Sequence, residues 1–244
     1  MKSIIRNCIH ESEIFIAEEY DRLGNTIYIY KSSSTKKGIY SLKNEIKGFK
    51  WYHEKFKSDL EISIEKETKN YLKLKSKYIF GKKYPPENGF YKNKLYLKNI
   101  LEHYCNIWGE SSSKKGLYNL HGDFTIENII FQKSIPIIID WEHFQKSVCP
   151  IGFDALNLIF EQLWFEEDNQ RTKKNIIKEL NLMIKYLRER NVLDPIFFEN
   201  PLEKMTQFIK NNLKFWNKQE KKLPVLKFSY EEINIIDKII SNLK

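Results

Sequence analysis

The stretch LHGDFTIENIIFQKSIPIIID, residues 120–140, decides how the rest of this 244-residue chain is interpreted. It contains two short apolar runs separated by turn residues at 132–134, a pattern that predicts a hairpin of two strands. Asp123 and Asn128 stand before the first run, and Asp140 ends the second. The hairpin would therefore fix the separation of three oxygen-bearing side chains through its backbone hydrogen bonds.

The three side chains are of the types that phosphoryl transfer requires. This reaction needs a carboxylate that orients the attacking hydroxyl, magnesium that neutralises the phosphates, and a cation over the phosphate chain. Asp123, on a loop leaving a strand that ends near Leu120, is placed to accept the proton of that hydroxyl. Asn128 and Asp140 offer the oxygen ligands that Mg²⁺ prefers. We expect His121 to brace this loop through hydrogen bonds rather than to act as a base.

The first third of the chain is predicted to form an antiparallel sheet. Alternating apolar and polar residues predict strands at residues 4–9, 13–19, 26–31, 60–65 and 71–80. In the third of these strands the alternation places Lys31 on the same face as Ile27 and Ile29. Lys31 is thus expected at the end of a strand, on its apolar side.

A helix is predicted over residues 41–57, after a polar loop. Glu45 lies in its first turns, so a helix packed on the sheet would let Glu45 reach Lys31 and direct its ammonium towards phosphate. The alternative is that Lys31 is an ordinary strand-end lysine and Glu45 a solvated helix residue. Three other lysines remain candidates for the phosphate contact: Lys36, Lys37 and Lys43.

The pattern changes after residues 81–89, GKKYPPENG, where turn residues and two prolines predict a hinge. Helical spacing then predicts helices at residues 92–108, 155–166, 171–190, 202–220 and 230–243. The order of elements favours an α+β protein with two lobes. We expect a small nucleotide-binding lobe at residues 1–83 and a larger catalytic and substrate-binding lobe at residues 84–244.

Composition narrows the classes of partner. The hydrophobic fraction of 41% is typical of a globular protein. Lys and Arg number 41 against 32 Asp and Glu, and this net charge of +9 favours acidic partners such as nucleotides, phosphorylated sugars or an anionic membrane surface. Because the lysines are spread along the whole sequence, a solvated surface explains them as well, and no nucleic acid is expected as a partner.

The cysteines and the hydropathy pattern indicate in which cellular compartment the protein is located. Cys8, Cys105 and Cys149 are far apart and lack CxxC spacing, which predicts reduced thiols in a cytoplasmic protein. No stretch approaches the roughly 20 apolar residues of a membrane-spanning helix. We therefore expect no membrane span, although peripheral contact with a membrane stays open, as does the oligomeric state.

Two motifs resemble those of the aminoglycoside phosphotransferase and choline kinase-like superfamily. The family's HGDxxxxN loop matches His121–Asn128, and its apolar strand ending in IDWE or IDFE matches Ile139–Glu142. The resemblance implies a two-lobed protein-kinase-like fold with a small antiparallel-sheet lobe and a larger, mainly helical lobe. It further implies ATP and Mg²⁺ as cofactors, Asp123 as catalytic base, and Asn128 and Asp140 as metal ligands.

Weaker parts of the resemblance extend to other residues. Residues 152–158, GFDALNL, look like the family's Gly-x-Asp-Leu segment, which implies that Asp154 caps a helix and bonds to the catalytic loop. The order of a strand with Lys31 and a helix with Glu45 implies that these two residues bind the nucleotide. No glycine-rich loop over the phosphates is evident, so GTP is not excluded.

The expected acceptor is a hydroxyl of a small molecule, bound between the catalytic loop and the C-terminal helices. Five carboxylates are candidates for lining that cleft: Glu142, Glu161, Glu166, Glu167 and Asp168. The basic net charge favours a saccharide or another polar metabolite as acceptor. The alternatives are an aminoglycoside or choline kinase, whose cationic substrates would use these carboxylates, and a kinase-fold binding protein without turnover.

Overall fold

The computed structural model describes residues 3–6, 13–56, 60–84, 90–109, 117–164, 170–201 and 203–207. By their contacts the residues form two compact units, Met1–Gly81 with Ile139–Phe144, and Lys82–Ile138 with Gln145–Lys244. Among the described helices none has the length and apolar character to cross a membrane.

Several sequence predictions lie wholly or partly outside the described residues. They are Cys8, the end of the strand at 4–9, the hinge residues 85–89, the carboxylates 166–168, most of the helix at 202–220 and the helix at 230–243.

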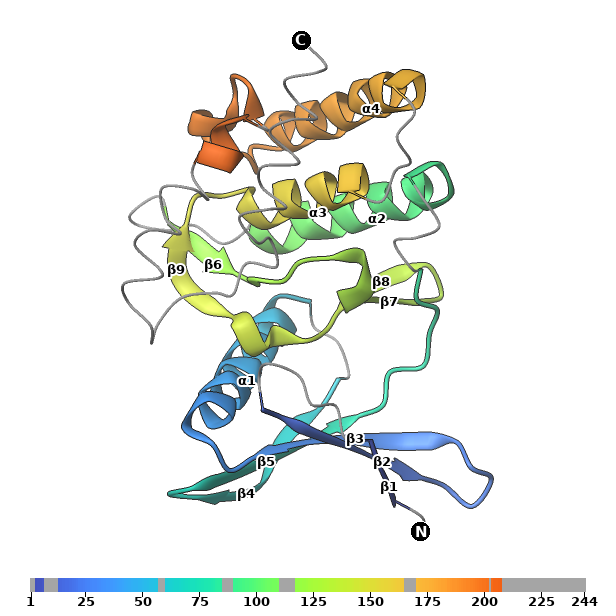
Figure 1. Cartoon of the computed structure of the whole chain (residues 1–244), viewed down its shortest axis with the longest axis vertical. Coiled ribbons are helices and arrows are strands. Elements are labelled where there is room, and N and C mark those ends of the chain that lie inside the picture. Colours follow the sequence, from blue (N-terminus) through green and yellow to red (C-terminus); the bar gives the residue numbers. More distant parts are fainter. Residues whose placement is uncertain are drawn as a thin grey trace. The chain divides into compact units, whose positions relative to one another are not determined.

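The first unit is built on a five-stranded antiparallel sheet (Figure 1). Its strands, in spatial order, are β1 (Ser3–Arg6), β2 (Phe15–Tyr20), β3 (Thr26–Ser33), β5 (Tyr71–Lys77) and β4 (Ile62–Thr68). All five lie where alternation predicts them, with ends shifted by a few residues. The prediction of an antiparallel sheet is confirmed.

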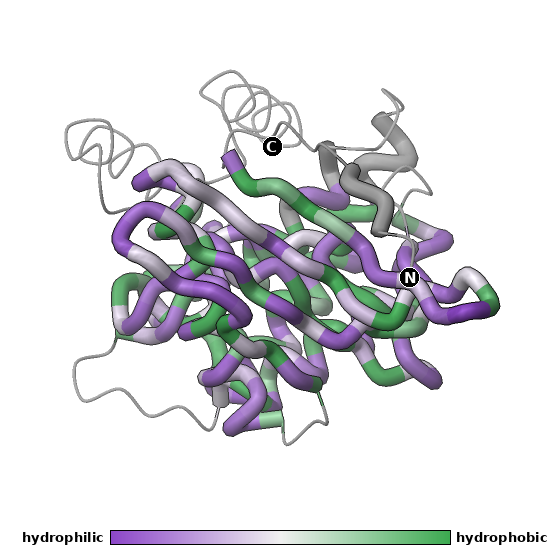
Figure 2. The backbone as a smooth tube through the Cα atoms, turned by 90° about the horizontal axis from the view of Figure 1, so that it is seen from below, coloured by the Kyte–Doolittle hydropathy of each residue, from purple (hydrophilic) through white to green (hydrophobic). Residues whose placement is uncertain are grey.

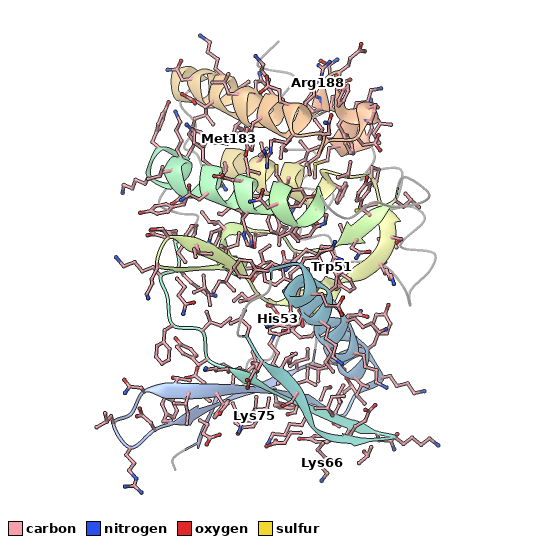
Figure 3. The ribbon with its side chains drawn as sticks, turned by 180° about the vertical axis from the view of Figure 1, so that it is seen from behind. Trp51, His53, Lys66, Lys75, Met183 and Arg188 are labelled. Atoms are coloured by element: carbon pink, nitrogen blue, oxygen red, sulfur yellow. The ribbon has the colours of Figure 1, made fainter. Side chains whose placement is uncertain are left out.

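The two faces of this sheet differ in character. Apolar and polar residues follow one another along the strands (Figure 2), and in β5 the side chains of Leu72 and Leu74 are buried. Lys75, labelled with Lys66 in Figure 3, belongs to the opposite face, where its ammonium lies 3.7 Å from the centre of the Tyr28 ring. The sheet therefore has one face for a core and one that carries lysines over tyrosines.

Helix α1 (Lys36–Phe56) packs on the apolar face. Its residue Leu42 forms a core with Leu72, Leu74 and Ile14. The helix begins at Lys36 rather than at the predicted Ser41, because the Thr35 hydroxyl accepts the free backbone N–H of Gly38 at 3.1 Å. The polar loop that the sequence suggested is thus divided between the end of β3, a capping residue and the first turn of α1.

The second unit is mainly helical. Its helices are α2 (Phe90–Trp108), α3 (Phe153–Trp164) and α4 (Gln170–Glu189), and α3 contacts both of the others (Figure 1). The described helices confirm the predicted ones in number and position up to residue 190. Met183 and Arg188 belong to α4 (Figure 3).

Two short strand pairs complete this unit. The predicted hairpin is present as β7 (Ile129–Gln132) and β8 (Ile135–Ile138), and β6 (Tyr118–Leu120) pairs with β9 (Gln145–Cys149). Strand β9 was not predicted. Between β6 and β7 runs the loop of residues 121–128, which ends in the short 3-10 helix η2 (Ile126–Asn128); we call residues 121–128 the HGD loop.

Candidate functional site

Asn128 fixes the position of Asp123 inside the HGD loop. Its amide nitrogen donates to the Asp123 carboxylate at 2.8 Å and to the Asp123 carbonyl oxygen at 2.9 Å. The backbone N–H of Thr125 also donates to that carbonyl oxygen, at 3.0 Å. Because the amide nitrogen of Asn128 is engaged in this way, its oxygen is the end that can coordinate a cation.

His121 lies behind this pair and is fully buried. Its Nδ1 accepts the backbone N–H of Asp123 at 3.2 Å, and its ring meets the Phe124 ring edge to face. An imidazole nitrogen that accepts a backbone N–H carries no proton of its own. These contacts are those of a residue that braces the loop.

Asp154 holds the start of the HGD loop from α3. Its carboxylate accepts the backbone N–H of His121 at 2.7 Å and that of Gly122 at 3.2 Å. Gly122 has φ of +90°, a conformation that favours glycine. Asp154 lies in the first turn of α3, as its second residue, and the expected bonding to the loop is present.

Burial raises the pKa of Asp154 to about 7, although the two backbone N–H groups act in the opposite direction. The charge of Asp123 raises this pKa further.

This raised pKa predicts a stability that depends on pH. The folded state holds the Asp154 proton up to about pH 7, whereas the unfolded chain releases it near the ordinary value of 3.8. Folding therefore takes up a proton between pH 3.8 and about pH 7. The contribution of Asp154 to stability is lost as pH rises through this range. We expect the unfolding free energy of the wild type, minus that of Asp154→Asn, to fall by roughly 3 kcal/mol between pH 4 and pH 7.5. Urea unfolding at several pH values measures it, and a constant difference would contradict the assignment.

Three predicted residues come together in the first unit. Lys31 on β3 places its ammonium 3.0 Å from the Glu45 carboxylate on α1 and 2.6 Å from the Asp140 carboxylate. The predicted contact between Lys31 and Glu45 is therefore present, and both side chains are largely buried. Of the rival lysines, Lys43 pairs with Glu67 at the surface, and Lys36 and Lys37 are exposed in the first turn of α1.

The charges of this group are strongly coupled. Burial alone lowers the pKa of the Lys31 ammonium, but Asp140 and Glu45 outweigh it and hold the pKa above its ordinary value. Burial raises the pKa of Glu45 to about 7, against the opposing effect of Lys31. One ammonium faces two carboxylates here. Asp140 is the more exposed carboxylate and lies closest to Lys31. Because this negative charge favours the protonated amine, Lys31 is charged.

The backbone at Asp140 is unusual. Its φ of 64° and ψ of 60° are left-handed, a conformation that costs a residue other than glycine on the order of 1 kcal/mol. The next residue, Trp141, is fully buried and lies 5.2 Å from the Tyr52 ring of α1. α1 approaches closely here, since a Cβ on Gly48 would lie 2.7 Å from that of Trp141. Packing of Trp141 thus holds Asp140 in its strained conformation.

The carboxylates expected in a substrate cleft have other contacts. Glu142 lies 3.2 Å from His143 Nε2 in the first unit. Glu161 is only 4% exposed, and its Oε2 accepts the backbone N–H of Ile126 at 3.0 Å. The expectation that Glu161 lines a cleft is therefore wrong. One feature of the sequence agrees with the observed position of Glu161 and was not used in the prediction: it lies seven residues after Asp154, two turns along the same helix.

The donor set fits magnesium in kind. Asp140 and Asn128 supply carboxylate and amide oxygens, the ligand types that Mg²⁺ selects. Among the described residues no group of three or more His, Cys, Asp or Glu could hold a metal ion. A magnesium ion bound mainly through substrate phosphates and water needs only one or two protein oxygens.

No protein-family model and no curated protein matches the chain. Among the solved structures that are similar to it are the following two. One is an amicoumacin kinase, hAmiN, in complex with AMP-PNP, Ca²⁺ and Ami, with a TM-score of 0.47, 11% identity, and coverage of 96% of this chain and 86% of that one. The other is the streptomycin–ATP–APH(2")-IIa ternary complex, with a TM-score of 0.48, 10% identity, and coverage of 94% and 93%. Both likenesses are too distant to carry an activity or a substrate over to this chain.

Proposed function

We propose that this chain is an ATP- and Mg²⁺-dependent phosphotransferase that moves the γ-phosphate to a hydroxyl of a small molecule. The observation that carries the proposal is the position of the Lys31 ammonium between Glu45 and Asp140. The strand lysine and helix glutamate that were predicted as a pair meet the candidate metal ligand at one point. Burial of these charges costs desolvation free energy, which an ion pair at the protein surface would not cost.

Each residue has a role in this proposal. Asp123 accepts the proton of the acceptor hydroxyl as it attacks, and the Asn128 amide keeps the carboxylate aligned. Lys31, oriented by Glu45, contacts the phosphates. Asp140 and the oxygen of Asn128 would hold magnesium, which when bound neutralises charge on the phosphates.

In this proposal the nucleotide and the acceptor substrate bind to different parts of the chain. Residues 1–83 form the nucleotide-binding lobe, and residues 84–244 form the catalytic and substrate-binding lobe. We propose a cytoplasmic protein, consistent with Cys105 and Cys149 being free and buried. Burial raises the pKa of the Cys105 thiol to about 11, so this cysteine is protected from oxidation.

The net charge of +9 favours a saccharide or another polar metabolite as acceptor. The test is ATP consumption, with and without Mg²⁺, against a panel of sugars, lipopolysaccharide-core saccharides, aminoglycosides and choline, with GTP as a second donor. Magnesium-dependent turnover with one class of acceptor would support the proposal and name the substrate. Turnover with none, together with no binding of magnesium nucleotide, would overturn it.

A further inference from the structure

We infer that Glu161 is a positioning residue that anchors the far end of the HGD loop to α3. Asp154 holds the beginning of the loop, and Glu161 holds its end, so that Asp123 lies on a segment fixed at both sides. The catalytic consequence of this inference rests on the proposed function, whereas its structural part does not.

The spacing of the two carboxylates matches the loop. Residues seven apart on a helix lie two turns apart on the same face, separated by roughly 10 Å along the axis. Asp154 accepts the backbone N–H groups of His121 and Gly122, and Glu161 accepts that of Ile126 at 3.0 Å. Helix α3 thus presents acceptors to both ends of the loop from one face.

The bond from Ile126 to Glu161 lies in a dry environment. Ile126 is fully buried and Glu161 is 4% exposed, and α3 contacts both α2 and α4 (Figure 1). A buried backbone N–H requires an acceptor, and the Thr125 side chain does not provide one as a cap for η2. Glu161 Oε2 is that acceptor, at 3.0 Å from the Ile126 nitrogen.

Ile126 in turn determines where Asn128 lies. The backbone N–H of Asn128 donates to the Thr125 carbonyl oxygen at 3.1 Å, which closes the turn of η2 that Ile126 opens. The Asn128 amide then holds the Asp123 carboxylate. Release of Ile126 would therefore loosen Asp123 and Asn128 while leaving Lys31 and Glu45 paired. Misplacement of a reacting group by about 1 Å costs on the order of 100-fold in rate.

The experiment compares Glu161→Leu, Glu161→Gln and Gln162→Leu in the full chain. Native-state hydrogen exchange gives the protection of the Ile126 amide relative to amides of α2, which report overall stability. Gln162 is the matched control, since it is buried on the same helix but its amide donates only to the Leu158 carbonyl oxygen. Each variant is also assayed for kcat and for the KM of ATP.

In Glu161→Leu we expect the relative protection of Ile126 to fall by roughly 30-fold. Glu161→Gln, which keeps an acceptor oxygen, should lose less than about 5-fold, and Gln162→Leu should show no selective loss. Where turnover is measured, kcat should fall by roughly 10- to 100-fold in Glu161→Leu with a smaller change in the KM for ATP, and it should recover in Glu161→Gln.

The two proposals fail in different ways. Unchanged relative protection of Ile126 in Glu161→Leu would overturn the anchor, whatever the enzyme does. Selective loss of protection with no loss of kcat would overturn its catalytic role. A wild type that turns over no acceptor and binds no nucleotide would overturn the proposed function while the exchange result on the anchor still stands.

Discussion

Asp123→Asn is expected to lower kcat by roughly 100- to 10,000-fold, the contribution of a positioned general base. Asparagine has the same size and keeps an oxygen that can accept the Asn128 amide, a bond of 2.8 Å in the wild type. It cannot take up the proton of the hydroxyl. The loss should therefore appear in kcat, with the KM for ATP nearly unchanged.

The matched control is Glu127→Gln, which neutralises an exposed carboxylate in the same loop and should keep full activity. Steady-state kinetics with the best acceptor of the panel measures both variants. An Asp123→Asn protein that consumes ATP as fast as the wild type in the presence of that acceptor would remove Asp123 as the base. If the wild type itself showed no turnover, a binding protein with this fold would be the better description.

Lys31→Met is expected to affect both stability and nucleotide binding. It removes the cation between Glu45 and Asp140 and leaves Glu45, only 6% exposed, without its ion pair. Breaking a buried pair from one side costs roughly 3 kcal/mol. Burial has already raised the pKa of Glu45 to about 7, so this carboxylate can take up a proton and recover part of the loss at lower pH.

A second substitution separates the two effects. The double variant Lys31→Met/Glu45→Leu removes both buried charges and should recover most of the stability, yet it should not recover affinity for ATP. The control is Lys43→Met, which breaks an exposed pair with Glu67 and should cost less than about 1 kcal/mol. Urea unfolding and calorimetric titration with ATP measure both quantities. Wild-type ATP affinity in Lys31→Met, or its loss in Lys43→Met, would show that another lysine contacts the phosphates.

Local patterns were sufficient for most elements of the fold. The hairpin β7–β8, the five strands of the first unit and helices α2 to α4 follow from alternation and helical spacing, because these patterns are set by which side chains one element buries. The start of α1 was misplaced since a single capping residue, Thr35, decides it. Capping depends on one hydrogen bond, which a polar stretch does not reveal.

Some contacts between distant residues were not predicted from the sequence. The Lys31–Asp140 pair joins positions 109 residues apart, and the left-handed conformation of Asp140 depends on the packing of Trp141 against α1. Glu161 was assigned to a cleft as one of several carboxylates in the C-terminal helices that could contact an acceptor. Glu161 is buried because α3 packs against other helices and because its carboxylate accepts a backbone N–H of the HGD loop. The residue spacing within α3 alone predicts neither contact.

The central claim is that the chain binds a nucleotide together with magnesium through Asp140. Calorimetric titration with ATP, in Mg²⁺ and in EDTA, tests it most directly in the wild type and in Asp140→Asn. We predict binding to the wild type that is at least about tenfold tighter in Mg²⁺, a difference of about 1.4 kcal/mol, and loss of this magnesium dependence in Asp140→Asn. Equal affinity with and without Mg²⁺ in the wild type, or no binding in either, would contradict the claim.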